Sequence, residues 1–339
     1  MSGSQSDRVA ADIRDYWDSL VKPPGSLGDL EEWVTRLGRI QETDRPEIDP
    51  ACLLLFAGDH GVARENVSAY PQSVTAAMLQ TIQEGGAAIN SLCEEVGLNL
   101  EWYNLGARNG PTRDDERIGH GTENMLHGPA LSDEHLWKAL EAGRLALRKR
   151  LENGLKLVAL GEIGIGNTTA SSAMAGAILD CSVEDVVGPG TGVEGDQLNH
   201  KKEIVKTVLD RRDPDPDDGF QVLQSVGGYE IAAQVGVILE ASDRNVPVLL
   251  DGFITGAAAL ASSRIDPAVK QVLVATHVSA EPAHRRVLDA LGLTPMIDLN
   301  LRLGEGSGAA LAYPLLKSAL AAYRGMQTFE DAGLNGAGS

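Results

Sequence analysis

The sequence is short of aromatic residues and of positive charge. Aromatic side chains make up 4% of the 339 residues, and 29 basic residues stand against 48 acidic ones, which gives a net charge of −19. A surplus of negative charge disfavours attraction to nucleic acid or to an anionic membrane, so we expect neither as a partner. Aliphatic packing with few aromatics favours an α/β protein over a β-sandwich.

Cysteine and long apolar runs are also scarce. The three cysteines, Cys52, Cys93 and Cys181, are widely spaced, which indicates free thiols in a reducing compartment. No uninterrupted apolar run reaches membrane-spanning length, and the first residues lack a basic and apolar signal region. The sequence therefore predicts a cytoplasmic protein. Histidine and cysteine never fall at metal-ligand spacing, and we expect no metal and no cofactor.

Glycine is abundant, at 38 residues, and gathers in turns that follow short apolar runs. Residues 155–160 read as a buried strand, 161–169 as a glycine-rich turn with Glu162 and Thr168, and 170–179 as a helix. Such a turn brings backbone amides and the positive end of a helix dipole to one point, which suits a phosphate. A tight strand-to-helix turn without a ligand is the alternative reading of the same pattern.

Two further glycine turns lie near charged residues. In the turn 188–192, the amides and Thr191 can bind an anion, and Lys201 follows shortly after it. Lysine is usually solvated, but in so acidic a chain Lys201 is a candidate phosphate contact. In the turn 302–308, Glu305 stands between glycines and is either free to face a ligand or a glutamate of a surface loop.

Strands and helices alternate along most of the chain. Strands are expected at 51–56, 98–104, 155–160, 246–250 and 271–276. Helices are expected at 7–20, 26–41 with a Ser26 and Asp29 capping box, 73–82, 132–151 with Ser132 as cap, 170–179, 199–209, 228–241, 254–262, 281–291 and 309–323 with a kink at Pro314. The pattern predicts a largely parallel sheet with helices on both faces, and a long polar loop at 106–129.

Polar groups recur at the expected strand ends, where ligands bind in open α/β sheets. They are Asp59 with His60, Glu162, Asp251 and Ser279. Asp59 and His60 have a second reading, in which the carboxylate caps the next turn and the imidazole fills space.

Three nucleotide-binding motifs are incomplete. The turn 188–192 lacks the Gly-Lys-Ser/Thr ending of a P-loop, and the strand end 248–252 lacks the second acid of transferases that use a ribose pyrophosphate donor. Gly164 and Gly166 begin a dinucleotide fingerprint, but Thr169 replaces its third glycine. A nicotinamide-dinucleotide oxidoreductase and a non-catalytic nucleotide-binding protein remain the rival readings.

Eight segments stand out together. They are KPPGSLGDLE at Lys22, AGDHGVA at Ala57, VSAYPQSVT at Val67, GEIGIGNTT at Gly161, GPGTG at Gly188, LDGFITGAA at Leu250, THVSAEPAH at Thr276 and LRLGEGSGAALA at Leu301. In sequence and order they resemble the nicotinate-nucleotide:dimethylbenzimidazole phosphoribosyltransferase family of cobalamin nucleotide-loop assembly. The resemblance implies a Rossmann-like α/β domain over 46–299, a small helical domain from residues 1–45 and 300–339, and a homodimer.

The resemblance also implies a reaction and a site. The family transfers 5-phosphoribose from nicotinate mononucleotide to 5,6-dimethylbenzimidazole with inversion, giving α-ribazole 5′-phosphate and nicotinate. By resemblance Glu305 is the general base and Glu162 stabilises the cationic sugar. The residues expected to contact substrate are Ser68, Tyr70, Gly164, Gly166, Asn167, Thr168, Gly190, Thr191, Gly192, Lys201, Asp251, Ser279, Arg302 and Leu303.

The chain departs from the family in the helix after Val74 and Thr75. Members often carry Gln there, whereas this chain has Ala76 and Ala77. A missing amide removes a hydrogen bond to the bound base or its neighbours, so adenine or a phenol stays open beside 5,6-dimethylbenzimidazole as the acceptor.

Overall fold

The computed structural model describes residues 5–113 and 117–334. Residues 1–4 and 335–339 of the expected helical domain, and residues 114–116 of the expected polar loop, lie outside the described residues. Within the described part of the chain, no helix has the length and apolar character needed to cross a membrane.

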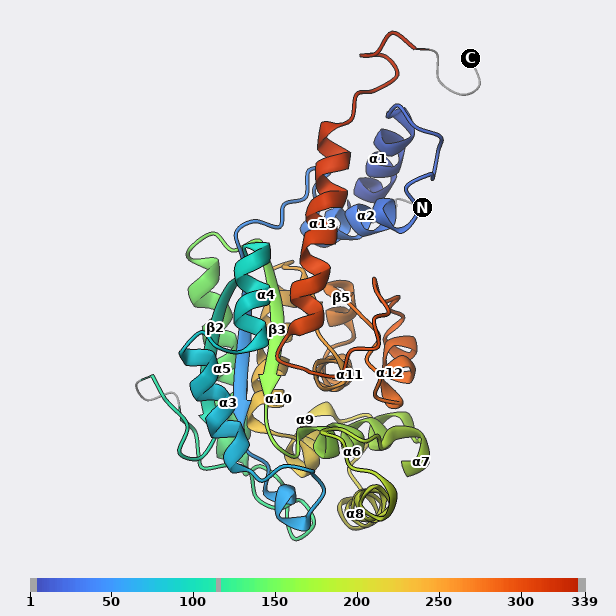
Figure 1. The fold of residues 1–339 in the computed structure, drawn as a ribbon. Helices are drawn as coiled ribbons and strands as arrows, with labels where there is room; N and C mark the ends of the chain where they lie inside the picture. Colours follow the sequence, from blue (N-terminus) through green and yellow to red (C-terminus); the bar gives the residue numbers. More distant parts are fainter. Residues whose placement is uncertain (1–4, 114–116, 335–339) are drawn as a thin grey trace.

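Five parallel strands form one sheet in the order β2-β1-β3-β4-β5 (Figure 1). They are β1 (Ala51–Gly58), β2 (Asn99–Gly106), β3 (Leu157–Ile163), β4 (Val248–Leu250) and β5 (Leu273–Ala275). The expected parallel α/β fold is confirmed. The strand order reverses between β1 and β3, and the crevice at such a switch point is where open α/β sheets bind ligands.

The helices that surround the sheet alternate with the strands along the chain. They are α3 (Ser73–Gln83), α4 (Ala88–Val96), α5 (Asp133–Leu151), α6 (Asn167–Leu179), α7 (Val183–Val186), α8 (Gly195–Arg212), α9 (Gly219–Val226), α10 (Tyr229–Asp243), α11 (Phe253–Ile265), α12 (Ala283–Leu291) and α13 (Ser307–Gly325), with short 3₁₀ helices η1 (Gly61–Glu65) and η3 (Pro267–Gln271). α3, α4 and the start of α13 pack over one face of the sheet, and α10 and α11 over the other (Figure 1).

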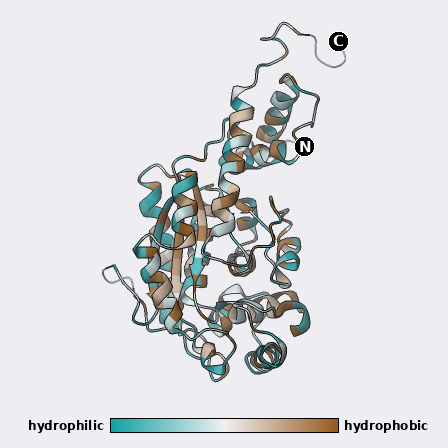
Figure 2. Cartoon of the chain, viewed as in Figure 1, coloured by the Kyte–Doolittle hydropathy of each residue, from teal (hydrophilic) through white to brown (hydrophobic). Residues whose placement is uncertain are grey.

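The two central strands are buried along their whole length. Every residue of β1 and β3 is buried, because helices cover both faces, and both strands are therefore largely apolar (Figure 2). Outside the sheet, α5 and α10 pack closely together. A Cβ at Gly143 or Gly236 would overlap a backbone carbonyl of the other helix, so glycine permits this contact.

A helical extension stands beyond the amino ends of the strands (Figure 1). It consists of α1 (Gln5–Ser19), α2 (Asp29–Gln41) and the second half of α13, which continues through Pro314. Trp17 of α1 packs on Tyr323 of α13, with ring centroids 4.9 Å apart. The division of the chain at residues 45 and 299 stays a prediction, because α13 contacts β3 and α4 as well as α2.

Several expected boundaries are wrong in ways that matter for the site. β3 runs on to Ile163, so Glu162 lies inside the strand and opposite Phe56 of β1. α6 begins at Asn167, three residues earlier than expected, which puts Thr168 in its first turn. Pairing with β1 extends the strand through residues whose glycines, taken locally, indicate a turn.

Two helix predictions need further correction. The Ser26 and Asp29 capping box is absent: α2 follows Gly28, and the Glu31 carboxylate accepts the Leu27 amide instead. The helix α9 has no counterpart among the expected helices, and Asp218 caps it by accepting two amides. The Ser132 cap of α5 is confirmed, since its hydroxyl accepts the His135 amide at 3.2 Å.

Candidate active site

A cavity of about 570 Å³ opens beyond the carboxyl ends of β3, β4 and β5. Most of the residues expected from the sequence line it. These are Tyr70, Glu162, Gly164, Asn167, Thr168, Gly190, Thr191, Ser279, Arg302, Leu303 and Glu305. A cavity of this size at the carboxyl edge of a parallel sheet is typical of a small-molecule binding site.

Glu305 lies in a turn that forces an unusual backbone. Its φ is 63°, and its neighbours Gly304 and Gly306 have φ of 81° and 88°. The side chain is 5% exposed, and one carboxylate oxygen, Oε2, is buried without a hydrogen-bond partner. Burial raises the pKa of Glu305, and the amide of Ile89 at the start of α4 opposes this rise. The group is therefore a proton acceptor of raised basicity on the cavity wall.

Glu162 approaches the same turn from β3. It is 5% exposed, accepts a hydrogen bond from the Asn167 side chain, and lies so close to Gly304 that a Cβ there would be 2.5 Å from Oε1. Burial raises the pKa of Glu162 well above its ordinary value, and the nearby carboxyl groups of Asp251, Glu230 and Glu305 raise it further. The ionised form of such a group is stabilised most when positive charge develops beside it.

Lys201 lies behind the cavity wall, without reaching the cavity itself. Its side chain is fully buried, and its Nζ donates to the Thr168 hydroxyl at 3.1 Å and to the Gly188 carbonyl at 2.9 Å. Burial lowers its pKa to about 8, partly offset by Glu281. Lys201 thus ties the start of α6 to the turn 188–192, the two expected phosphate-binding segments.

The turn 188–192 is also held by Glu281 and by Ser68. Glu281 accepts the Gly190 amide at 2.8 Å, and burial raises its pKa. Ser68 lies outside the cavity wall, with its hydroxyl 2.9 Å from the Thr191 hydroxyl. Gly192 has φ of 111° and likewise does not line the cavity.

The exposed residues that line the cavity include two large apolar ones. Tyr70 and Leu303 line it and are each 55% exposed. Met78 of α3 also lines the cavity, whereas its neighbour Ala77 is exposed and outside the lining. A planar aromatic molecule fits such surroundings, and the small side chain of Ala77 offers it no hydrogen bond.

Asp251 lies below the cavity at the end of β4. It is 2% exposed, and its oxygens accept the amides of Gly306 at 3.1 Å and Gly308 at 2.7 Å. Burial raises its pKa to about 7, and these amides oppose the rise. Ser279 lines the cavity at the end of β5, and its amide donates to Nδ1 of His284.

Asp59 and His60 are buried, and His60 lies against Gly166 of the expected phosphate-binding turn. A Cβ at Gly166 would lie 2.9 Å from the Cβ of His60, whose Nε2 is 2.5 Å from a carboxylate oxygen of Glu230. Asp59 accepts the Arg108 amide at 2.8 Å, and burial raises its pKa. Both residues therefore have structural partners, and neither lines the cavity.

Sequence reasoning missed part of the cavity wall. The additional lining residues are Met78, Ile163, Ile165, Gly252, Phe253, Ile254, His277, Glu281, Asn300, Leu301 and Gly304. The apolar ones carry no chemical signature in a sequence. His277 and Glu281, however, fall in the segment THVSAEPAH at a strand end, the same signal that points to Ser279.

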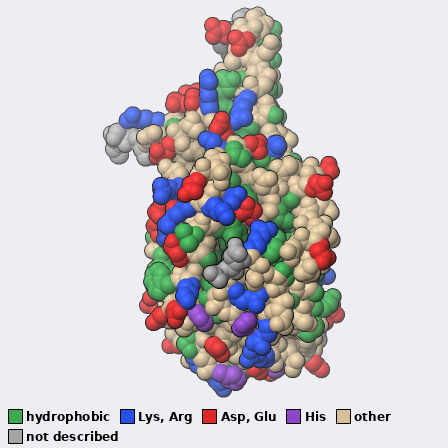
Figure 3. Space-filling model, turned by 90° about the vertical axis from the view of Figure 1, so that its left-hand side faces the viewer, with side chains coloured by type: hydrophobic (Ala, Val, Ile, Leu, Met, Phe, Trp, Pro, Cys, Tyr) green, Lys and Arg blue, Asp and Glu red, His purple; other side chains and the backbone are tan. Residues whose placement is uncertain are grey.

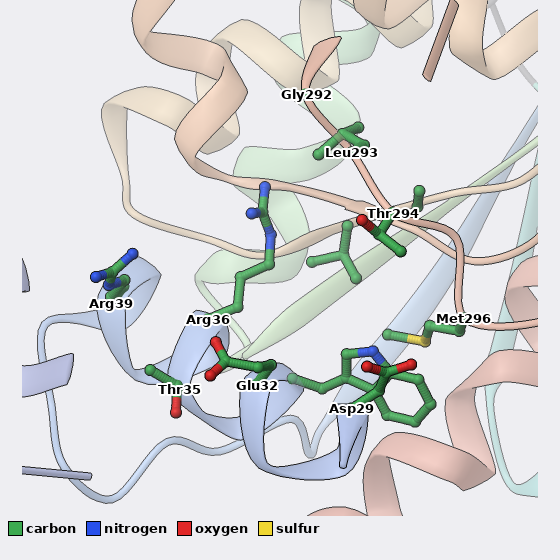
Figure 4. A pocket seen from close by; sticks show the side chains of 12 residues that line it. Asp29, Glu32, Thr35, Arg36, Arg39, Gly292, Leu293, Thr294 and Met296 are labelled. Carbon is green, nitrogen blue, oxygen red and sulfur yellow. The ribbon is translucent and has the colours of Figure 1, made fainter. Parts of the chain in front are cut away.

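A second, smaller cavity of about 300 Å³ lies between α2 and the segment after β5 (Figure 4). Arg36 crosses it and donates to the carbonyls of Leu273 and Lys270, while Glu32 and Arg39 stand beside it. These groups join the helical extension to the sheet, and none of the described residues gives this cavity a buried, unpartnered carboxylate. The larger cavity is therefore the candidate active site.

Comparison with known proteins identifies the family of this chain. A family model described as phosphoribosyltransferase matches residues 3–334. The nicotinate-nucleotide–dimethylbenzimidazole phosphoribosyltransferase of Desulforamulus reducens is 43% identical over 94% of this chain and 92% of its own length. The enzyme of that name from Pseudomonas fluorescens is 45% identical over 92% and 90%.

A solved structure extends the likeness to three dimensions. The crystal structure of CobT from Thermus thermophilus is similar with a TM-score of 0.92 and 41% identity, covering 97% of this chain and 99% of that one. The match thus covers nearly the whole chain and is not limited to the sheet. This chain belongs to the nicotinate-nucleotide–dimethylbenzimidazole phosphoribosyltransferase family.

Proposed function

We propose that this protein transfers 5-phosphoribose from nicotinate mononucleotide to 5,6-dimethylbenzimidazole, giving α-ribazole 5′-phosphate and nicotinate. The observation that carries the proposal is the pair of buried carboxyl groups, Glu305 and Glu162, on the wall of one cavity beside two glycine turns. The names of relatives that match more than nine-tenths of the chain support the same substrates.

The donor requires no general acid to protonate its leaving group. When the bond between C1′ and the pyridinium nitrogen breaks, the electron pair passes to that nitrogen and neutralises its charge, so nicotinate leaves unprotonated. A benzimidazole nitrogen attacks C1′ from the opposite face, which inverts the anomeric carbon from β to α. The ring's N–H must then lose its proton, and Glu305 accepts it; its raised pKa suits a general base that works near neutral pH.

Glu162 acts on the sugar. The ribose carries positive charge while the old bond breaks and the new one forms, and an ionised Glu162 stabilises that charge. Binding of the cationic donor favours the ionised form, which burial alone disfavours. The ionised Glu162 carboxylate therefore lowers the free energy of the transition state more than it lowers the free energy of the unliganded protein.

The remaining contacts hold the substrates. We assign the 5′-phosphate to the amides of the segments 164–168 and 188–192 together with Arg302, and the charge of Lys201 acts through the Thr168 hydroxyl that it binds. The aromatic base lies between Tyr70 and Leu303. We also propose that the protein works as a homodimer and in the cytoplasm, where its free cysteines stay reduced.

The test is product analysis after mixing the protein with nicotinate mononucleotide and one acceptor at a time: 5,6-dimethylbenzimidazole, adenine or a phenol. We expect α-ribazole 5′-phosphate and an equal amount of nicotinate, with the α linkage established by NMR. Glu305→Gln should reduce the rate about 1,000-fold, as expected for loss of a general base. Glu240→Gln, a buried carboxylate away from the cavity, is the matched control and should retain activity.

Different results would revise different parts of the proposal. Product with adenine or a phenol but not with 5,6-dimethylbenzimidazole would change the acceptor and keep the reaction. No nicotinate release with any acceptor would refute the transferase function. Sedimentation velocity tests the dimer separately, and a single species at the monomer mass of 35.8 kDa would refute it.

A further inference from the structure

The turn that holds Glu305 has a backbone that side chains rarely allow. Gly304, Glu305 and Gly306 all lie in the left-handed region, with φ of 81°, 63° and 88°. An L residue with a Cβ seldom adopts this conformation, so Glu305, unlike the two glycines beside it, requires support from the surroundings. Of these three residues only Glu305 has a side chain, and Glu305 lines the cavity.

The surroundings leave the turn little room. A Cβ at Gly304 would lie 2.5 Å from Oε1 of Glu162, and a Cβ at Gly306 would lie 2.6 Å from a methyl group of Leu53. A Cβ at Gly308 would overlap the ring of His277. Close packing excludes side chains, but it does not by itself select the left-handed conformation for Glu305.

Asp251 supplies the specific restraint. Its Oδ2 accepts the Gly306 amide at 3.1 Å, and its Oδ1 accepts the Gly308 amide at 2.7 Å. The two bonds reach 55 and 57 residues along the chain and join the end of β4 to the start of α13. An ionised carboxylate at this place also meets the positive end of the α13 dipole.

We propose that Asp251 is a positioning residue: by accepting the amides on both sides of Ser307 it fixes the left-handed turn, and the turn aims the Glu305 carboxylate at the acceptor nitrogen. This inference rests on the proposed function of Glu305 as base. It replaces the expectation that Asp251 contacts substrate with a role that acts through Glu305.

Three observations favour positioning over substrate contact. Asp251 is 2% exposed, it is absent from the residues that line the cavity, and both of its oxygens already accept backbone amides. Burial and the missing contact with the cavity therefore argue against substrate contact, and the two amide bonds account for the orientation of the carboxylate.

The test is the Asp251→Asn variant. Its side-chain oxygen can still accept one of the two backbone amides, but its NH₂ group faces the other amide and cannot accept a hydrogen bond from it. We expect kcat to fall about 100-fold, the scale of a misplaced catalytic group, while KM for nicotinate mononucleotide changes less than about threefold. In a Glu305→Gln background the same change should lower the residual rate less than about threefold, because the two residues act as one unit.

The matched control is Asp218→Asn. Asp218 also accepts two backbone amides at the start of a helix, α9, but it is exposed and does not line the cavity. It should leave kcat and KM unchanged. If Asp251→Asn raises KM strongly, or lowers the rate equally with and without Glu305, Asp251 contacts substrate and the inference is wrong.

Amide hydrogen exchange provides a readout that does not depend on activity. In Asp251→Asn we expect faster exchange at residues 306–308, with the rest of the sheet as protected as in the wild type. Inactive wild-type protein would refute the proposed function but leave this test standing. Asp251→Ser is made in parallel, and failure of both variants to fold would overturn the inference, since Asp251 would then serve overall stability.

Discussion

The two ends of helix α10 place a buried carboxylate in different surroundings, one beside a histidine and other acids and one among arginines. Glu230, in its first turn, lies beside His60 at the carboxyl edge of the sheet, within the group of acids that includes Glu162. Glu240, near its last turn, lies 2.8 Å from Arg148 and 3.3 Å from both Arg144 and Arg244. Hydrogen bonding to Arg148 contributes most to lowering the pKa of Glu240, whereas that of Glu162 is raised.

This contrast extends over the two edges of the sheet. Among the described residues, no Lys or Arg comes within 4.0 Å of the carboxylates of Glu162, Glu281 or Glu305. Away from this edge charges are interspersed, and one face of the molecule shows basic side chains set among acidic ones (Figure 3). A buried acid without a cation is costly, and its retention at one edge marks the place where substrate supplies the missing charge.

Neutralising an acid at the cavity should separate activity from stability most strongly. Glu162→Gln should reduce phosphoribosyl transfer about 100- to 1,000-fold, because a preorganised charge beside the reacting sugar is lost. Its unfolding free energy should stay the same or rise, since a neutral amide replaces a buried acid whose ionisation burial disfavours. Steady-state kinetics and urea unfolding measure both. A variant that keeps its activity but loses stability would show that Glu162 is structural.

Adding one methyl group to the Glu305 turn should cost stability as well as activity. Gly304→Ala introduces a Cβ 2.5 Å from Oε1 of Glu162 at a residue whose φ is 81°, so we expect a loss of about 2–3 kcal/mol in unfolding free energy. Gly325→Ala is the control, since a Cβ there meets no atom within 4 Å apart from its chain neighbours and the nearby backbone of its own helix. Urea unfolding checks the difference, and equal stabilities would mean that the turn is free to rearrange.

Acidification should destabilise the carboxyl edge through His284. Burial lowers the pKa of His284 from 6.5 to about 3, so below pH 6.5 the unfolded chain takes up a proton that the folded protein refuses. Stability from this group is present above pH 6.5 and is lost as pH falls towards 3. His284→Asn, whose side-chain oxygen can still accept the Ser279 amide, should flatten the pH dependence by about 1.4 kcal/mol per pH unit.

Unfolding of wild type and variant at several pH values between 6.5 and 4 measures that slope. The exposed His127, at 69%, provides the control variant His127→Asn, which should follow the wild type. Parallel curves for wild type and His284→Asn would show that the folded protein accepts the proton on His284 without penalty.

The smallest effect is expected at the paired edge. Glu240→Gln should lower the unfolding free energy by about 1 kcal/mol at pH 7, a modest value because its arginine partners are 27–59% exposed and screened by water. Its pKa is lowered by folding, so this contribution is present above the unfolded pKa of about 4.3 and is lost as pH falls further. If the difference in unfolding free energy between wild type and variant is the same at pH 7 and at pH 3, the assignment is wrong.

Much of the fold could be predicted because its determinants are local. Apolar runs predict the buried strands, Ser132 predicts the start of α5, and alternation of strands with helices predicts a parallel sheet. The errors arise where tertiary pairing overrides local signals. Pairing of β3 with β1 carries the strand past Gly161 to Ile163, and Glu31 replaces the expected cap of α2.

The sequence by itself determined the positions of the glycine turns, the acids near the carboxyl ends of the strands and the family. Only the tertiary structure decided what surrounds each side chain. It buries Lys201 behind Thr168, gives both oxygens of Asp251 to amides 55 and 57 residues away, and keeps cations away from Glu162. The physical reason is that desolvation and charge pairing depend on distances in space, which local sequence preferences leave undetermined.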